Sequence, residues 1–236
     1  MIKTAVVIAG GEGSRLRPFT YNKPKTLIKI GGKPILQWII ELLKSYGIKH
    51  IILGVAYKKE KIYQFMKNNN NFGLKVDFSE HTVEGGTAQA FKFAIERFVT
   101  DSTFLGINGD ELTNINIFKL VEKHEMHKPL VTMALAPFHC RFSVVKFERD
   151  HKITEFEYGA KLRDIPISIG LYVFNHQILN HIPSRGSIED LVFAKLAKEG
   201  KMRAYMLSAE EDWISINTMK DLNEAEGKIK AWNSEH

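Results

Sequence analysis

Four cations follow a glycine-rich turn near the amino end of the chain. The turn, Gly10-Gly-Glu-Gly-Ser14, comes directly after the apolar run 4–9, which predicts a buried strand. The next eleven residues contain no acid and four basic residues: Arg15, Arg17, Lys23 and Lys25. Glycines let backbone N–H groups approach an anion closely, and nearby cations neutralise its charge. The spacing therefore predicts a binding site for a dense, flexible anion such as a triphosphate.

Two familiar phosphate-binding motifs are absent from this turn. The P-loop ends in Gly-Lys-Ser/Thr, which does not occur here, and the dinucleotide fingerprint needs a third glycine where Leu16 stands. Pro18 and Pro24 keep residues 15–25 extended or turned rather than helical. We therefore expect the phosphates to meet a long basic loop, not only a helix N-terminus.

A carboxylate after a later strand complements this loop. The predicted strand 102–108 runs into Gly109 and Asp110. Ligands of open α/β sheets lie beyond the carboxyl ends of the strands, so Asp110 is expected at the same rim as the glycine turn. A carboxylate facing phosphates is repelled unless a hard cation lies between them, and Mg²⁺ uses one or two carboxylates plus phosphate oxygens. The alternative is that Asp110 only caps a turn.

The elements that must position these groups alternate along the first half. Strands are predicted at 3–9, 50–56, 74–79, 102–108 and 130–136, and helices at 34–46, 58–68, 86–98 and 115–127. In the second half we expect strands at 142–148, 152–158, 167–174 and 202–207, a short apolar piece at 213–217, and helices at 187–199 and 219–232. This order predicts a doubly wound α/β fold with a mostly parallel sheet and a small antiparallel elaboration.

Composition excludes several other classes of protein. Of the 236 residues, 44% are hydrophobic and 25% charged, which is ordinary for a soluble globular chain. No apolar run approaches the ~20 residues of a membrane-spanning helix, so no membrane partner is expected. Cys140 is the only cysteine, which favours a reducing cytoplasm. The net charge of +6 is spread along the chain without a nucleic-acid-binding signature. His124 and His127 lack a third ligand and are expected to face solvent.

Three segments together resemble the sugar-nucleotide pyrophosphorylase family. They are Gly10-Gly-x-Gly-Ser-Arg-Leu-x-Pro18, Lys23-Pro-Lys25 and Gly109-Asp110. Later segments are similar to further family signatures in the same order: 85–90, 168–172, 187–190 and 213–218. Members of this family are nucleotidyltransferases with a Rossmann-like fold that join an NTP to a sugar 1-phosphate. The resemblance implies one domain over 1–236, with a nucleotide-binding half at 1–140 and a sugar-binding elaboration at 141–236.

The resemblance also implies roles for individual residues. Arg15 and Lys25 would grip the triphosphate and the transferred α-phosphate, and Asp110 would bind Mg²⁺. The nucleotide would be held by Ala9, Gly10, Gly11, Gly13, Ser14, Gly86, Gln89 and Gly109. The sugar would be held by Glu157, Gly170 and Glu189. The expected partners are an NTP, a sugar 1-phosphate and further copies of the chain in a homo-oligomer.

The chain departs from the family pattern at two places. Ser215 stands where the family carries an aspartate as second metal ligand, so Glu111, Glu211 or Asp212 is a candidate substitute. Glu157 lacks the lysine that follows it in the family, unless Lys161 takes that place. These departures keep a second interpretation open, a regulatory protein that binds an NTP or NDP-sugar without turnover. A cytidylyltransferase of the isoprenoid-precursor type is a third.

The nucleobase also stays open at this point. Gln89 favours a pyrimidine, whereas the Ser187–Asp190 segment resembles guanylyltransferases.

Overall fold

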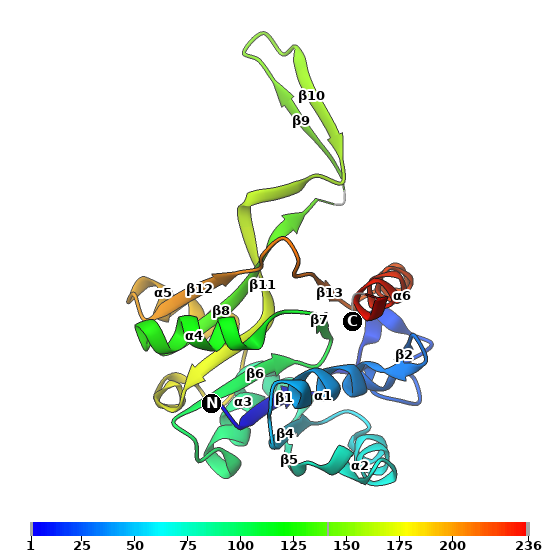
Figure 1. Ribbon diagram of the computed structural model, residues 1–236, viewed down its shortest axis with the longest axis vertical. Coiled ribbons are helices and arrows are strands. Elements are labelled where there is room, and N and C mark those ends of the chain that lie inside the picture. The colour runs from blue at the N-terminus through cyan, green and yellow to red at the C-terminus, as the bar shows by residue number, and fades with distance from the viewer. Residues whose placement is uncertain (1, 141, 235–236) are drawn as a thin grey trace.

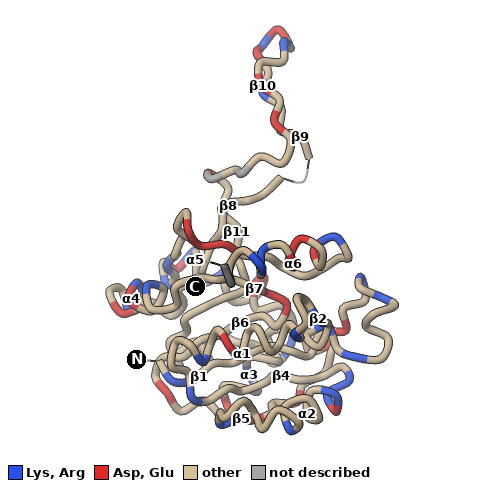
Figure 2. The backbone as a smooth tube through the Cα atoms, turned by 45° about the vertical axis from the view of Figure 1, so that its right-hand side comes forward, with Lys and Arg blue, Asp and Glu red and all other residues tan. Residues whose placement is uncertain are grey.

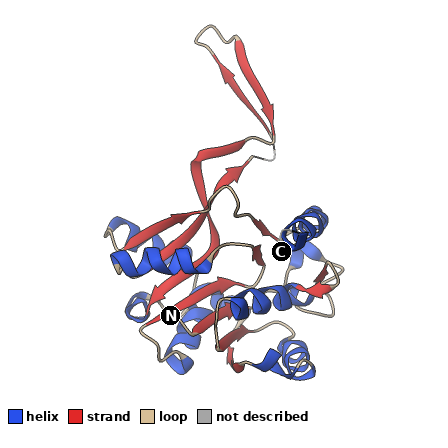
Figure 3. Ribbon diagram, in the orientation of Figure 1, coloured by secondary structure: helices blue, strands red, loops and turns tan. Residues whose placement is uncertain are grey.

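The computed structural model describes residues 2–140 and 142–234. A seven-stranded sheet runs through the body of the molecule in the order β12-β8-β11-β6-β1-β4-β5 (Figure 3). Its strands are β1 (Thr4–Ile8), β4 (His50–Val55), β5 (Lys75–Glu80), β6 (Thr103–Asn108), β8 (Val131–His139), β11 (Lys161–Asn175) and β12 (Met202–Met206). Only β11 runs antiparallel to its neighbours. The predicted mostly parallel sheet is therefore confirmed.

Helices cover both faces of this sheet, as the doubly wound prediction requires. They are α1 (Ile35–Ser45), α2 (Lys59–Asn68), α3 (Gly86–Phe98), α4 (Ile117–His127), α5 (Ala194–Lys198) and α6 (Met219–Ser234), with a π-helix at Glu189–Phe193 leading into α5. Alternate side chains of β1 enter two separate cores. Ala5 and Val7 pack with α1, α2, α4 and α6, whereas Val6 packs with α3 and α5. Within the described ranges, no helix has the length and apolar character to cross a bilayer.

Two short pairings bring distant segments together near the carboxyl end of the parallel strands, and a third pairing is local. The backbone N–H of Gly109 donates to the carbonyl of Ile8 at 2.8 Å, so the ends of β6 and β1 lie side by side. β7 (Glu111–Thr113) pairs antiparallel with β13 (Trp213–Ser215), which sets Ser215 opposite Glu111. β2 (Lys29–Ile30) and β3 (Lys33–Pro34) form a tight hairpin before α1. Neither β7 nor the β2–β3 hairpin was among the predicted strands.

The predicted strands at 142–148 and 152–158 exist but do not join the main sheet. β9 (Ser143–Phe147) and β10 (Ile153–Tyr158) pair only with each other, and their hairpin stands out from the body (Figure 1). β8 and β11 run past the predicted ends toward this hairpin.

One side-chain prediction is wrong. His124 is not solvent-facing but 2% exposed, and its Nδ1 lies 3.0 Å from the hydroxyl of Thr132 on β8.

Candidate active site

Lys25 and Asp110 meet at the carboxyl edge of the sheet, as the sequence predicted. Lys25 begins a single 3₁₀ turn, Lys25–Leu27, and its side chain is 9% exposed. Its Nζ donates to Asp110 Oδ2 at 2.5 Å and to Asn217 Oδ1 at 3.0 Å. The side chain of Asp110 is 30% exposed to solvent. A buried cation and a half-buried carboxylate thus share one rim, where a phosphate group could contact the first and a cation the second.

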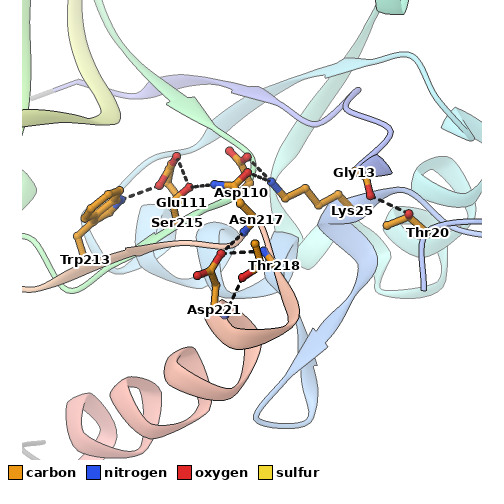
Figure 4. Close-up of polar contacts among 10 residues, drawn as sticks. All are labelled: Gly13, Thr20, Lys25, Asp110, Glu111, Trp213, Ser215, Asn217, Thr218 and Asp221. Atoms are coloured by element: carbon orange, nitrogen blue, oxygen red, sulfur yellow. Dashed lines mark hydrogen bonds and ion pairs between the residues drawn. The ribbon is translucent and has the colours of Figure 1, made fainter. Parts of the chain in front are cut away.

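A continuous chain of hydrogen bonds extends from this pair (Figure 4). Asn217 Nδ2 donates to Ser215 Oγ at 2.7 Å, and Ser215 Oγ donates to Glu111 Oε1 at 3.0 Å. Trp213 Nε1 donates to the other Glu111 oxygen at 2.6 Å. Burial and the charge of Asp110 hold the pKa of the Glu111 carboxyl well above its usual range, although these two donors and Lys25 oppose the shift. The network orients Lys25 through Asn217, which lies 192 residues away in the sequence.

The glycine turn packs directly against Lys25. Gly13 has φ of +63°, and a Cβ there would lie 2.9 Å from the Cβ of Lys25. Its carbonyl accepts from the hydroxyl of Thr20 at 2.9 Å, which folds the basic loop back over the turn. A Cβ on Gly109 would meet the carbonyl oxygen of Ile8 at 2.4 Å. Glycine at these two positions is therefore a requirement of the local packing.

The outer part of the turn is open to solvent. Gly11, Ser14 and Arg15 are exposed, and a Cβ on Gly11 would find nothing within 4 Å. Ala9 and Gly10 are buried beneath them. Residues 14–16 form a single 3₁₀ turn and not an α-helix, in line with the predicted effect of the flanking prolines. A ligand can therefore approach the exposed backbone of the turn with Arg15 beside it.

The residues expected to contact the base lie at the start of α3. Gln89 Oε1 accepts from the backbone N–H of Thr82 at 2.9 Å, and its Nε2 donates to the carbonyl of Ser184 at 3.3 Å. Gly86 has φ of +68°, and a Cβ there would lie 2.4 Å from the carbonyl oxygen of Gly186. The segment that begins α3 is thus bound to the loop at 184–187.

Two of the three residues expected to contact the sugar face the same region. Glu189 Oε2 accepts from Thr87 Oγ1 at 2.8 Å and from Ser187 Oγ at 3.0 Å. A Cβ on Gly170 would lie 2.9 Å from both Asn108 Nδ2 and Glu111 Cγ. Burial raises the pKa of the Tyr172 phenol, and the charges of Glu189 and Glu111 add to the shift. Gly170 therefore lies against Glu111, and Glu189 is near enough for its charge to act on the Tyr172 phenol.

The third of these residues, Glu157, is not brought to this region. It is exposed on β10 in the projecting hairpin (Figure 1). The side chain of Lys161 lies outside the described residues.

The donors around Asp110 fit a hard cation. Asn108 Oδ1 is buried without a hydrogen-bond partner, and Glu111 supplies a second carboxylate next to Asp110. The other two candidate acids are engaged elsewhere: Glu211 accepts from Tyr205 at 2.9 Å, and Asp212 pairs with Lys228 at 2.6 Å. Residues 2–140 and 142–234 contain no cluster of three or more metal-ligating side chains. Mg²⁺ does not need one, because it takes one or two carboxylates and completes its shell with phosphate oxygens and water.

A cavity of about 500 Å³ opens beside this network. Its lining includes Trp213, Ser215 and Asn217, together with Tyr158 and Gly159 at the base of the hairpin. The site is thus continuous with the root of the projecting hairpin.

Sequence reasoning missed three residues that hold the site together. Asn217 accepts from Lys25, Thr87 holds Glu189, and Thr20 closes the basic loop. Asn217 lies within the 213–218 segment that carried part of the resemblance, so its polar side chain two residues after Ser215 was an available signal. Thr87 likewise lies within the 85–90 segment, but its partner Glu189 comes from a distant part of the chain. Thr20 lies in the basic loop itself, and its bond to the carbonyl of Gly13 depends on how that loop folds back.

Comparison with known proteins shows which family the chain belongs to. A family model described as "Nucleotidyl transferase" matches residues 4–231. The chain is 30% identical to a probable glucose-1-phosphate cytidylyltransferase of Bacillus subtilis, over 97% of this chain and 96% of that protein. It is 27% identical to a UTP–glucose-1-phosphate uridylyltransferase of Synechocystis, over 92% of this chain but only 61% of that protein.

A solved structure agrees with these relatives. HddC from Yersinia pseudotuberculosis superposes with a TM-score of 0.77 at 26% identity, over 97% of this chain and 100% of that chain. The matched family model, the similar relatives and the shared fold together show that this chain belongs to the nucleotidyl transferase family, in the group of sugar-1-phosphate nucleotidyltransferases.

Proposed function

We propose that this chain transfers a nucleoside monophosphate from an NTP to a sugar 1-phosphate and releases pyrophosphate. The observation that carries the proposal is the contact between Lys25 and Asp110 beside the glycine turn, with 2.5 Å between Nζ and Oδ2. An oxygen of the sugar phosphate forms a bond to the α-phosphorus of the NTP, and the bond from that phosphorus to pyrophosphate breaks. Such a transfer needs in-line placement and neutralised oxygens, and no covalent nucleophile.

The residues of the turn and loop would bind the triphosphate. Backbone N–H groups of the exposed turn face the phosphates, and Arg15 neutralises the part that leaves. Lys25 is held by Asp110 and Asn217, so its ammonium is fixed in direction before the substrate arrives. A fixed charge that faces the α-phosphate lowers the barrier without reorganisation during the reaction.

Asp110 and Glu111 would hold Mg²⁺ between them and the phosphates. When bound, the ion would neutralise the phosphate oxygens next to the reacting phosphorus. Of the three acids that could stand in for the aspartate missing at 215, Glu111 is the one that neighbours Asp110 and the hydroxyl of Ser215. In this proposal the second carboxylate has moved from position 215 to position 111.

The sugar would occupy the region around Glu189 and Gly170. Thr87 and Ser187 orient the Glu189 carboxylate, which can accept hydrogen bonds from sugar hydroxyls. Gly170 leaves room for the ring to approach, since a side chain there would fill the space beside Asn108 and Glu111. We propose that residues 1–140 supply the nucleotide side and 141–236 most of the sugar side, and Glu157 has no part in it.

The test is pyrophosphate release with each of the common NTPs against a panel of sugar 1-phosphates, with and without Mg²⁺. At least one pair should turn over, and only with the metal. Lys25→Met should lower kcat by about 10²–10³ in that reaction. The matched control is Lys29→Met, a lysine exposed on β2 four residues later, which should react like the unchanged protein.

The second candidate is a protein that binds an NTP without turnover, which the serine at position 215 favours. If no pair of NTP and sugar 1-phosphate releases pyrophosphate while an NTP still raises the melting temperature, the chain is a binding protein and not an enzyme. The chain spans 61% of the length of several of its curated relatives. The activities of those longer proteins are therefore only proposals for this chain, and the assay must be made on this chain itself.

A further inference from the structure

Tyr57 lies where the chain leaves β4, at the same edge of the sheet as the glycine turn. β4 ends at Val55, and Tyr57 follows two residues later, before α2 begins at Lys59. The backbone N–H of Tyr57 donates to the carbonyl of Gly10 at 3.2 Å. The turn is far from Tyr57 in the sequence, so the fold alone brings the two together.

The side chain of Tyr57 reaches the basic loop, residues 15–25. Its hydroxyl oxygen lies 3.0 Å from the carbonyl oxygen of Thr20 and 3.1 Å from that of Tyr21. A phenol has one proton, so the hydroxyl donates to one of these carbonyls at a time or shares its proton between them. Tyr57 therefore bonds the glycine turn through its backbone and the basic loop through its side chain.

A second contact joins the same loop to the turn. Thr20 Oγ1 donates to the carbonyl of Gly13 at 2.9 Å (Figure 4), and Thr20 is 1% exposed. Thr20 is thus held from two sides, at its hydroxyl by the turn and at its carbonyl by Tyr57. Together these contacts form a closed path from Gly10 through Tyr57 and Thr20 to Gly13, which fixes the loop over the turn.

Burial does not require the bond from Tyr57. Phe19 and Tyr21 are 47% and 55% exposed, so water reaches this part of the loop and could hydrogen-bond to its carbonyls. A hydrogen bond that is not needed to satisfy a buried group acts on position. It selects one arrangement of the loop from the several that solvent would allow.

We propose that Tyr57 is a positioning residue whose hydroxyl holds the basic loop in the arrangement that accepts the triphosphate. Arg15 and Arg17 lie between the turn and Thr20, so the bond to Thr20 limits where their charges stand. A loop that is ordered before the NTP arrives loses less conformational freedom on binding, which strengthens the affinity. This inference rests on the proposed function for the identity of the anion, but not for the contact itself.

The first experiment measures the loop without any turnover. Chymotrypsin cleaves after Phe and Tyr, so Phe19 and Tyr21 give it two sites in the loop, and mass spectrometry identifies the fragments. Tyr57→Phe should raise the rate of cleavage at these sites about 3-fold to 10-fold, because one hydrogen bond shifts a local opening equilibrium by about that factor. An NTP should slow the same cleavage in the unchanged chain. Phe156, 68% exposed in the projecting hairpin (Figures 1 and 2), is the internal control and should be cut at an unchanged rate.

Tyr63→Phe is the matched control variant. The hydroxyl of Tyr63 donates to Glu80 at 2.8 Å, so this variant also loses one phenol hydrogen bond, but away from the loop. Its loop should be cut as slowly as that of the unchanged chain. If Tyr57→Phe and Tyr63→Phe are cut in the loop at the same rate, the hydroxyl of Tyr57 does not hold the loop and the proposal fails.

The second experiment measures NTP binding by calorimetry, with each of the common NTPs. Tyr57→Phe should weaken the binding about 3-fold to 10-fold, whereas Tyr63→Phe should leave it unchanged. In the pyrophosphate assay, KM for the NTP should rise by the same factor, while kcat and KM for the sugar 1-phosphate stay within about twofold. A variant that is merely less well folded would lose activity without this selective change in one KM.

The outcomes separate this proposal from the proposed function. If the loop of Tyr57→Phe is cut faster but NTP affinity is unchanged, the loop does not position the triphosphate and the proposal is overturned. An NTP that gives the loop of the unchanged chain no protection overturns it as well. If cleavage and NTP affinity both change as expected in a chain that turns over no substrate pair, the transfer activity fails and the positioning role of Tyr57 stands.

Discussion

Introducing an acid at Ser215 should destabilise the protein through one specific neighbour. Ser215 Oγ donates to Glu111 Oε1 at 3.0 Å, and the Glu111 carboxylate is 8% exposed. Ser215→Asp replaces that donor with a carboxylate directly beside Glu111. Two like charges about 4 Å apart repel by about 4 kcal/mol at an effective dielectric constant of about 20. Because one acid can escape by taking a proton, we expect a loss of about 2–4 kcal/mol at pH 8.

The loss should depend on pH in a defined direction. Burial and Asp110 already raise the pKa of Glu111, and a new neighbouring charge raises it further. A carboxyl whose pKa is raised by folding gives a stability that is complete below its unfolded value and is lost as the pH rises through its folded value. The difference between Ser215→Asp and the unchanged protein should therefore be largest at pH 8 and shrink toward pH 5.

Urea unfolding of four proteins measures this coupling. They are the unchanged chain, Ser215→Asp, Glu111→Gln and the double variant, and Ser215→Asn serves as the uncharged control. The double variant should recover most of the loss, which gives a coupling free energy of about 2–4 kcal/mol. If Ser215→Asp and Ser215→Asn unfold at the same urea concentration at pH 8, the two carboxylates do not interact and the reasoning is wrong.

Three further predictions concern other parts of the molecule. Gly11→Ala should change the free energy of unfolding by less than about 0.5 kcal/mol, yet it should weaken NTP binding, which calorimetry measures. Gly109→Ala should lower the free energy of unfolding by about 1–3 kcal/mol, because its Cβ would meet the carbonyl oxygen of Ile8. Burial lowers the pKa of His124, so the stability of the protein should fall as the pH drops below about 6.5. His124→Asn should reduce this loss of stability, measured by thermal melts at pH 7 and 5. The control variant His127→Asn, at an exposed position, should not reduce it. Glu189→Gln should raise KM for the sugar 1-phosphate about 10-fold and leave KM for the NTP unchanged, and equal effects on both would contradict its proposed position.

The long elements were predictable because their residues follow a clear period. The helix predicted at 86–98 is α3 with the same ends, and β1, β4 and β6 lie within the predicted ranges. Strands of two or three residues, such as β7, have no period to detect and exist only through a partner. His124 was misplaced for a related reason, because its burial depends on Thr132 across the gap between α4 and β8.

The meeting of the glycine turn and Asp110 at one rim was predictable from topology, whereas the place of Lys25 beside them was implied by the family resemblance. The turn and Asp110 each follow a strand of the parallel sheet, and the carboxyl ends of such strands meet at one edge. The hydrogen bonds around them were not predictable, since Asn217 and Ser215 arrive from the far end of the chain on the β7–β13 pairing. The direction of the β9–β10 hairpin was not predictable either. Its alternating pattern gives two faces but does not say whether the faces meet the body or another molecule.

The interpretation of Ser215 changes once its neighbour Glu111 is known. In the sequence alone, the missing aspartate at this position is a reason to doubt the metal site. In the structure, an aspartate there would stand beside the buried Glu111 carboxylate, and the two charges could not both persist without a bound cation. A serine instead donates a hydrogen bond to Glu111 and accepts one from Asn217, so it satisfies both neighbours. In this chain the serine at 215 therefore leaves Asp110 and Glu111 as the two carboxylates of the network, and it avoids a third charge beside them.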